Sequence, residues 1–263
     1  MKRIRLKQLS ALAAMEMSTG WLAGAAVLAG CSALQGWNFA RELALEKQQI
    51  AQWNTFPDGF FICLQHSGFG NILNGGWGIL FLFLLLRSLW RSVGSRSPRQ
   101  LWGRLPLSAF EKAAAAAWAN FVWLSGFWGV QLLTVLGCWL AYSRQLPLRQ
   151  YGELSWTVLQ SPFLRQWFPL ARPVQLAGVL LALLAASILC AGLERGGRGR
   201  IRPLDPLDVG CLITLAILGW ILARMARWET AFLWVAVVIL LALCAGAYTA
   251  LCLFMENPIQ EEP

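Results

Sequence analysis

The chain has 263 residues, of which 57% are hydrophobic and only 13% are charged, and its formal net charge is +9. Because soluble domains carry about 25% charged residues, this composition excludes an ordinary soluble domain and predicts an all-α, polytopic membrane protein. The basic residues cluster beside apolar runs, where they orient membrane helices. We therefore expect membrane lipid, and no nucleic acid, to be the partner of these charges.

The amino-terminal segment, residues 1–16, combines lysines and arginines with spaced isoleucines and leucines. This pattern is typical of an amphipathic helix that lies in the membrane interface. Its positive charge is typical of a cytoplasmic segment. We therefore expect a multi-pass protein of the cell (plasma) membrane with a cytoplasmic amino terminus.

Six apolar runs approach the length of about 20 residues that a helix needs to cross the hydrocarbon core. They cover residues 17–36, 72–90, 115–142, 174–193, 209–223 and 231–254. We predict that each run is a transmembrane helix and that all six form a single transmembrane domain. The fifth run is short for a span.

The first run contains VLAGCS at residues 27–32, which is similar to the end of a bacterial lipoprotein signal, where a cysteine becomes lipidated. In that interpretation Cys31 would carry the lipid. In the alternative interpretation, Gly20 and Gly24 belong to a small-residue face that packs closely against another transmembrane helix. The apolar residues continue past Cys31 to Trp37, which favours helix packing and leaves lipidation open.

Residues 37–71 have few basic residues and are predicted to form an outside loop. Within this loop residues 38–54 favour a short helix on the membrane surface, which a Pro-Asp-Gly turn would end. Residues 144–172 are also expected outside, although their four arginines fit that side poorly.

Residues 91–114 are rich in arginine and are predicted to be cytoplasmic. Ser108 can cap a helix, and Glu111 stands three residues later, as in a capping box. A helix from Ser108 to Tyr142 would be about 50 Å long, which exceeds the roughly 30 Å of the hydrocarbon core. Its first turns should therefore stand outside the membrane, on the cytoplasmic side.

Catalytic chemistry has no recognisable signature in the sequence. The only histidine, His66, lies in the predicted outside loop, and neither HExxH nor GxxxxGK[ST] occurs. No CxxC spacing suggests a metal site. We therefore expect a protein that is not an enzyme, has no catalytic residue, no cofactor and no metal, and depends on a separate subunit for any ATP hydrolysis.

The stretch GRLPLSAFEK at residues 103–112 contains LPLS, which is similar to the "LP-hydrophobic-S" signature of permease subunits of type-2 ATP-binding-cassette exporters. The layout also resembles that family, which has six spans, an amphipathic helix before the first and a cytoplasmic coupling helix between the second and third. The resemblance implies contacts with a cytoplasmic ATPase subunit through Arg104, Leu105, Pro106, Leu107, Ser108, Phe110 and Glu111. Members commonly have re-entrant helices between the last two spans, where this chain has only a short hairpin at residues 223–231.

This resemblance leads to the hypothesis of a permease-like subunit that forms a homodimer or heterodimer and exports a hydrophobic or amphipathic substrate. An alternative from another class is a non-transporting scaffold or sensor that binds other membrane proteins. It would bind them through the small-residue face with Gly20 and Gly24 and through the outside loops.

Overall fold

The computed structural model describes residues 11, 14, 17–18, 20–53, 59–93, 108–146, 153–169, 172–193, 209–210, 212–218 and 230–256. Within these residues the secondary structure is entirely helical, in agreement with the predicted all-α class. The helices are α2 (Trp21–Trp53), α3 (Phe60–His66), α4 (Phe69–Val93), α6 (Ala109–Gln145), α7 (Glu153–Gln160), α8 (Pro162–Trp167), α9 (Pro173–Leu193) and α11 (Thr230–Glu256). A short helical stretch also covers residues 212–218.

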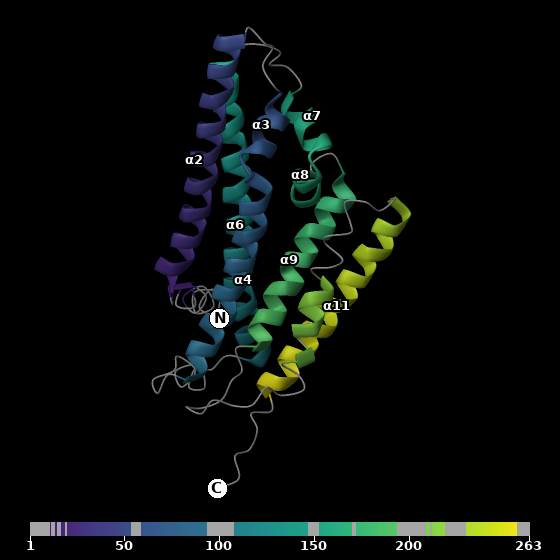
Figure 1. The fold of residues 1–263 in the computed structure, drawn as a ribbon. Helices are drawn as coiled ribbons and strands as arrows, with labels where there is room; N and C mark the ends of the chain where they lie inside the picture. Colours follow the sequence, from purple (N-terminus) through teal and green to yellow (C-terminus); the bar gives the residue numbers. More distant parts are fainter. Residues whose placement is uncertain are drawn as a thin grey trace.

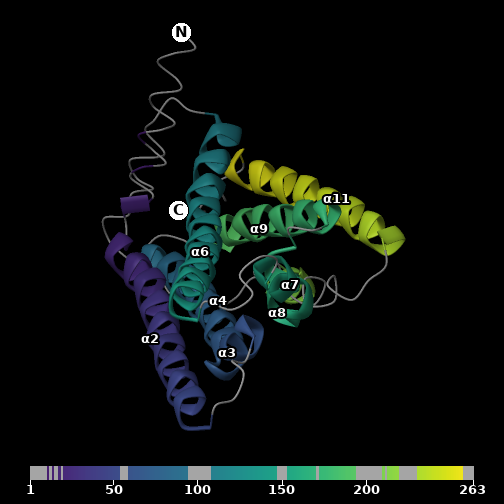
Figure 2. The ribbon, with the colours of Figure 1, turned by 90° about the horizontal axis from the view of Figure 1, so that it is seen from above.

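The long helices form an elongated bundle (Figure 1). Seen from above, α2, α4 and α6 group on one side, and α9 and α11 lie side by side on the other (Figure 2). Helix α6 joins the two groups because it packs against both α2 and α9. Helices α3, α7 and α8 lie toward the end of the bundle at which α2 and α6 end (Figure 1).

Two helices contain segments that are long and apolar enough to cross a membrane, namely Ala114–Gln145 in α6 and Pro173–Ala191 in α9. A third span results if Phe60–His66 and Phe69–Leu84 count as one broken helix with a bend of 54°. The bend falls at Gly68, whose positive φ of 68° favours glycine. The described residues thus provide two or three candidate spans, fewer than the six predicted.

The remaining predicted spans correspond only partly to apolar helices. In α11 the apolar stretch Trp234–Thr249 is shorter than a span by the same criteria of length and composition. The last third of the predicted span at residues 209–223 lies outside the described residues, and so does most of the hairpin at 223–231. So do most of residues 1–16 and of the predicted cytoplasmic loop at residues 91–114.

Helix α2 differs from the expectation of a span followed by a separate surface helix. It continues without a break for 33 residues, which corresponds to about 50 Å. No proline interrupts it, and its second half, RELALEKQQ, consists of strong helix formers. The first half of α2, residues 21–38, carries no charge, but its glycines, tryptophans, Gln35 and Asn38 make it less apolar than the candidate spans.

Small residues set the distance between α2 and its neighbours. A Cβ atom built on Gly24 would lie 2.5 Å from the ring of Trp123 on α6, and one built on Gly20 would lie 3.4 Å from the ring of Phe83 on α4. On α4, a Cβ on Gly76 would lie 2.7 Å from the Phe127 ring and 2.9 Å from the sulfur of Cys31. Gly20 and Gly24 therefore lie against helices of the same chain.

We predict that Gly24→Val lowers the free energy of unfolding by about 1–3 kcal/mol, because the added methyl groups overpack the contact with Trp123. Gly30→Val is the matched control, since a Cβ at Gly30 would meet nothing within 4 Å. Thermal unfolding of both variants in the same mild detergent measures the difference. Equal stability of the two variants would contradict the packing of α2 on α6.

Candidate functional site

The predicted ATPase contact lies partly within the described residues. Ser108, Phe110 and Glu111 are described and occupy the start of α6, whereas Arg104, Leu105, Pro106 and Leu107 lie outside the described residues. Ser108, Phe110 and Glu111 can therefore be placed. They belong to the cap and the first turn of one 37-residue helix.

The start of α6 is fixed by the predicted capping box. The Ser108 side chain accepts a hydrogen bond from the Glu111 backbone N–H at 3.2 Å, and the Ser108 N–H donates to Glu111 Oε2 at 2.9 Å. These bonds satisfy two of the backbone donors that a helix start leaves unpaired. The apolar span within α6 begins only at Ala114, so the capped turn stands outside it.

Tyr248 of α11 ties the start of α6 to the last part of the bundle. Its hydroxyl donates a hydrogen bond of 3.1 Å to the Phe110 carbonyl, and the two rings meet edge to face with centroids 5.0 Å apart. Phe110 nevertheless stays 60% exposed. The hydrogen bond and the ring contact therefore connect the start of α6 directly with α11.

An apolar groove lies between α6, α9 and α11, next to this link. It has a volume of about 470 Å³ and is lined by Ala114, Ala117, Trp118, Leu184, Ile188, Leu241, Cys244, Ala245 and Tyr248. The small side chains of the alanine run on α6 leave this space open between the helices. None of these lining residues is charged, and most are aliphatic, so the groove has the chemistry to hold a hydrocarbon chain.

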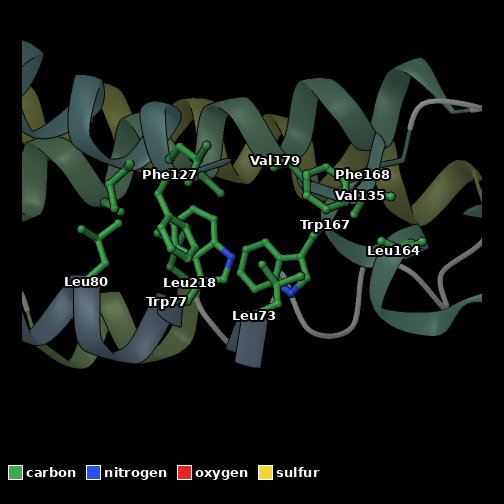
Figure 3. Close-up of a cluster of buried hydrophobic side chains, with 14 of the residues drawn as sticks. Leu73, Trp77, Leu80, Phe127, Val135, Leu164, Trp167, Phe168, Val179 and Leu218 are labelled. Carbon is green, nitrogen blue, oxygen red and sulfur yellow. The ribbon is translucent and has the colours of Figure 1, made fainter. Parts of the chain in front are cut away.

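An aromatic centre joins three elements in the middle of the bundle (Figure 3). The Trp77 ring of α4 stacks on the Trp167 ring of α8, with centroids 4.7 Å apart and an interplanar angle of 17°. The ring of Phe127 from α6 meets Trp77 edge to face at 4.8 Å. Phe127 lies about halfway along α6, so α8 enters the bundle deeply from the end where α7 lies.

Hydrogen bonds fix the orientation of this centre. The Trp128 indole N–H donates to the Trp167 carbonyl at 2.6 Å, and the Trp167 indole N–H donates to Asn74 Oδ1 at 3.2 Å. The bonds tie the carboxyl end of α8 to both α6 and α4. Buried indole N–H groups usually need such partners.

The aromatic centre was not predicted, because residues 144–172 were expected to be an outside loop. The structure folds about half of this segment into α7 and α8 and buries Trp167. A sequence signal was present in Ser161 followed by Pro162, which is a typical helix start. The Ser161 side chain indeed accepts a hydrogen bond from the Leu164 N–H at 3.3 Å.

A buried charge was also missed. Arg87 lies on α4 within the predicted second span and is only 6% exposed. The ring of Phe83 on α4 contacts the ring of Trp123 on α6. Because the two helices run in opposite directions, Arg87, one turn after Phe83, lies near the level of Asn120, about one turn before Trp123. The Asn120 side chain donates to the Ser187 carbonyl of α9 at 3.5 Å. Ionisable residues within membrane helices commonly mark functional sites.

Comparison of the chain with protein-family models, with curated proteins and with solved structures gave no match. The start of α6 with its groove and the aromatic centre are therefore interpreted from their own geometry and chemistry.

We predict that Trp167→Ala lowers the free energy of unfolding by about 3–5 kcal/mol, because it leaves a cavity beside Trp77 and Phe127. Trp37→Ala is the matched control, since Trp37 on α2 is 73% exposed. Thermal unfolding in detergent compares the two variants. Similar stability of both would show that Trp167 does not pack in the bundle.

Proposed function

We propose that the chain is a membrane-embedded, permease-like subunit of an ATP-driven exporter, powered by a separate cytoplasmic ATPase. The observation that carries the proposal is the start of α6, where an exposed Phe110 sits on a capped helix end and is bonded to Tyr248 beside an apolar groove. This arrangement gives an ATPase a rigid contact that could change the shape of a substrate site.

The proposed orientation places the start of α6 in the cytoplasm. Helices α2 and α6 both begin at one end of the bundle. Helices α4, α9 and α11 finish at this same end (Figure 1). In the sequence the arginine-rich residues 91–104 come between the end of α4 and the start of α6, and such positive charge is typical of cytoplasmic segments. The proposal includes six spans and an amino-terminal interfacial helix, as expected from the sequence.

The proposed mechanism uses the link between α6 and α11. An ATPase that pushes on the first turn of α6 displaces Phe110 and, through the 3.1 Å hydrogen bond, Tyr248. Because Ala114 of α6 and Tyr248 of α11 both line the groove, this displacement changes its shape. A groove without charged groups suits a hydrophobic substrate or the hydrocarbon part of an amphipathic one.

We predict that Phe110→Asp, or the double change Leu105→Asp with Leu107→Asp, abolishes co-purification of an ATPase from native membranes. A charge would disrupt an apolar contact at the centre of the interface. Trp53→Asp is the matched control, because Trp53 is 74% exposed at the opposite end of α2. Mass spectrometry of the tagged complexes measures the ATPase relative to the chain.

The outcomes separate two candidate functions. Loss of a stoichiometric ATPase in Phe110→Asp but not in Trp53→Asp supports the exporter. If the wild type has no ATPase and Trp53→Asp loses another membrane protein, the alternative of a scaffold or sensor is favoured. That alternative is supported by two exposed aromatic residues of α2, Trp37 at its middle and Trp53 at its end.

A further inference from the structure

The groove between α6, α9 and α11 opens on the outer side of the bundle. Its floor consists of buried side chains, Ala117 of α6, Ile188 of α9 and Cys244 of α11. Its rim consists of exposed side chains, Trp118 of α6 and Leu241 of α11. Because α6 and α9 both contain candidate membrane spans, an outward-facing groove between them opens toward the bilayer. A hydrocarbon chain can therefore enter the groove sideways from the membrane.

One end of the groove lies at the edge of the apolar part of the bundle. Ala114 is the first residue of the apolar span within α6, and it lines the groove together with Tyr248. On α11 the lining extends from Tyr248 back to Leu241, which corresponds to about 10 Å along the helix. The chains of one leaflet fill half of the roughly 30 Å of the hydrocarbon core. The groove can therefore take most of an acyl chain whose headgroup stays at the edge.

Water is a poor occupant of this groove, because a buried water needs about two to four polar partners. Only Trp118, Cys244 and Tyr248 among the lining residues have a polar side-chain group, and Trp118 stands at the exposed rim. The Cys244 thiol donates to the Leu181 carbonyl at 3.4 Å, and the Tyr248 hydroxyl donates to the Phe110 carbonyl. An empty groove would deprive its lining atoms of dispersion contacts. Hydrocarbon avoids both costs, and the bilayer supplies it.

We propose that the groove holds an acyl chain of a membrane lipid, which enters sideways from the bilayer and keeps its headgroup near Tyr248. As the substrate of the groove, this lipid rests on the proposed function, whereas its binding requires no ATPase. In the proposed orientation the lipid comes from the cytoplasmic leaflet. The hydrogen bond between Tyr248 and Phe110 then lies beside the headgroup, so a movement of the start of α6 acts where the lipid enters.

A photoreactive phospholipid tests the proposal on the purified full chain. The chain is placed, without any ATPase, in phosphatidylcholine vesicles in which a small share of the lipid carries a diazirine in one acyl chain. On illumination the diazirine loses dinitrogen, and the carbene that remains inserts into a C–H, S–H or O–H bond of the nearest side chain. Mass spectrometry of the peptides then locates the labelled residues.

The quantity measured is the labelling of the groove residues relative to the labelling of Leu86. Leu86 is an exposed residue of α4 outside the groove. It lies near the depth of Trp118, because α4 and α6 run in opposite directions and Phe83 meets Trp123 one turn away. We expect about fivefold more labelling in the groove, because a chain held there makes many dispersion contacts at once.

Ala245→Phe is the variant that should close the groove. Ala245 lines the groove and is exposed, so the ring can occupy the groove without displacing a buried side chain. Ala242→Phe is the matched control, since Ala242 is an exposed residue of α11 that does not line the groove. We expect Ala245→Phe to abolish the excess labelling and Ala242→Phe to keep it. Equal thermal midpoints of the two variants would exclude unfolding as the cause.

The proposal is overturned if the wild type shows no excess labelling in the groove, or if Ala245→Phe keeps the excess. Failure of the lipid site and failure of the exporter give different results. Excess labelling of a chain that co-purifies with no ATPase would refute the exporter and leave the lipid site standing. A stoichiometric ATPase without excess labelling would leave the exporter standing and refute the acyl chain as the occupant.

Discussion

The ring of Trp77 stacks on the ring of Trp167 and meets the ring of Phe127 edge to face. These contacts hold together parts of the chain that are far apart in sequence. They join the broken helix pair α3–α4, the long helix α6 and the short helices α7 and α8 in one apolar cluster. Aromatic pairs of this kind contribute about 0.5–1.5 kcal/mol beyond the area that they bury. A second ring contact supports this arrangement, because Phe163 of α8 stacks on Phe69, the first residue of α4 after the bend at Gly68.

Close helix packing at small residues is the second feature that the architecture requires. Gly24 and Gly76 let α2 approach α6 and α4, and the buried Ala115, Ala116 and Ala117 let α9 and α11 approach α6. Small residues play this part in membrane helices, where water does not drive helices together. Buried polar groups are exceptions in this bundle: Gln35 and Gln131 are fully buried without a hydrogen-bond partner among the described residues, and Arg87 is 6% exposed.

The sequence was sufficient for features that local chemistry determines. The capping box of Ser108 and Glu111 was enough to predict where α6 begins. The length of the apolar runs was enough to predict the spans in α6 and α9. The continuity of α2 was missed because its charged second half was assigned to a surface helix, although no residue between the halves ends a helix. The depth of α8 could not be predicted, because Trp167 reaches Trp77 only through contacts across 90 residues of chain.

The entry of α8 into the bundle is the central claim, and a disulfide between engineered cysteines tests it most directly. A Cβ atom on Gly70 would lie 3.5 Å from the Cβ of Phe163, which is suitable for a disulfide. We expect Gly70→Cys with Phe163→Cys to form this bond in native membranes under mild oxidation, as identified by mass spectrometry of the linked peptides. Gly75→Cys with Phe163→Cys should not form it, since a Cβ at Gly75 would meet nothing within 4 Å. Equal yields from both pairs, or no bond from the first, would contradict the account.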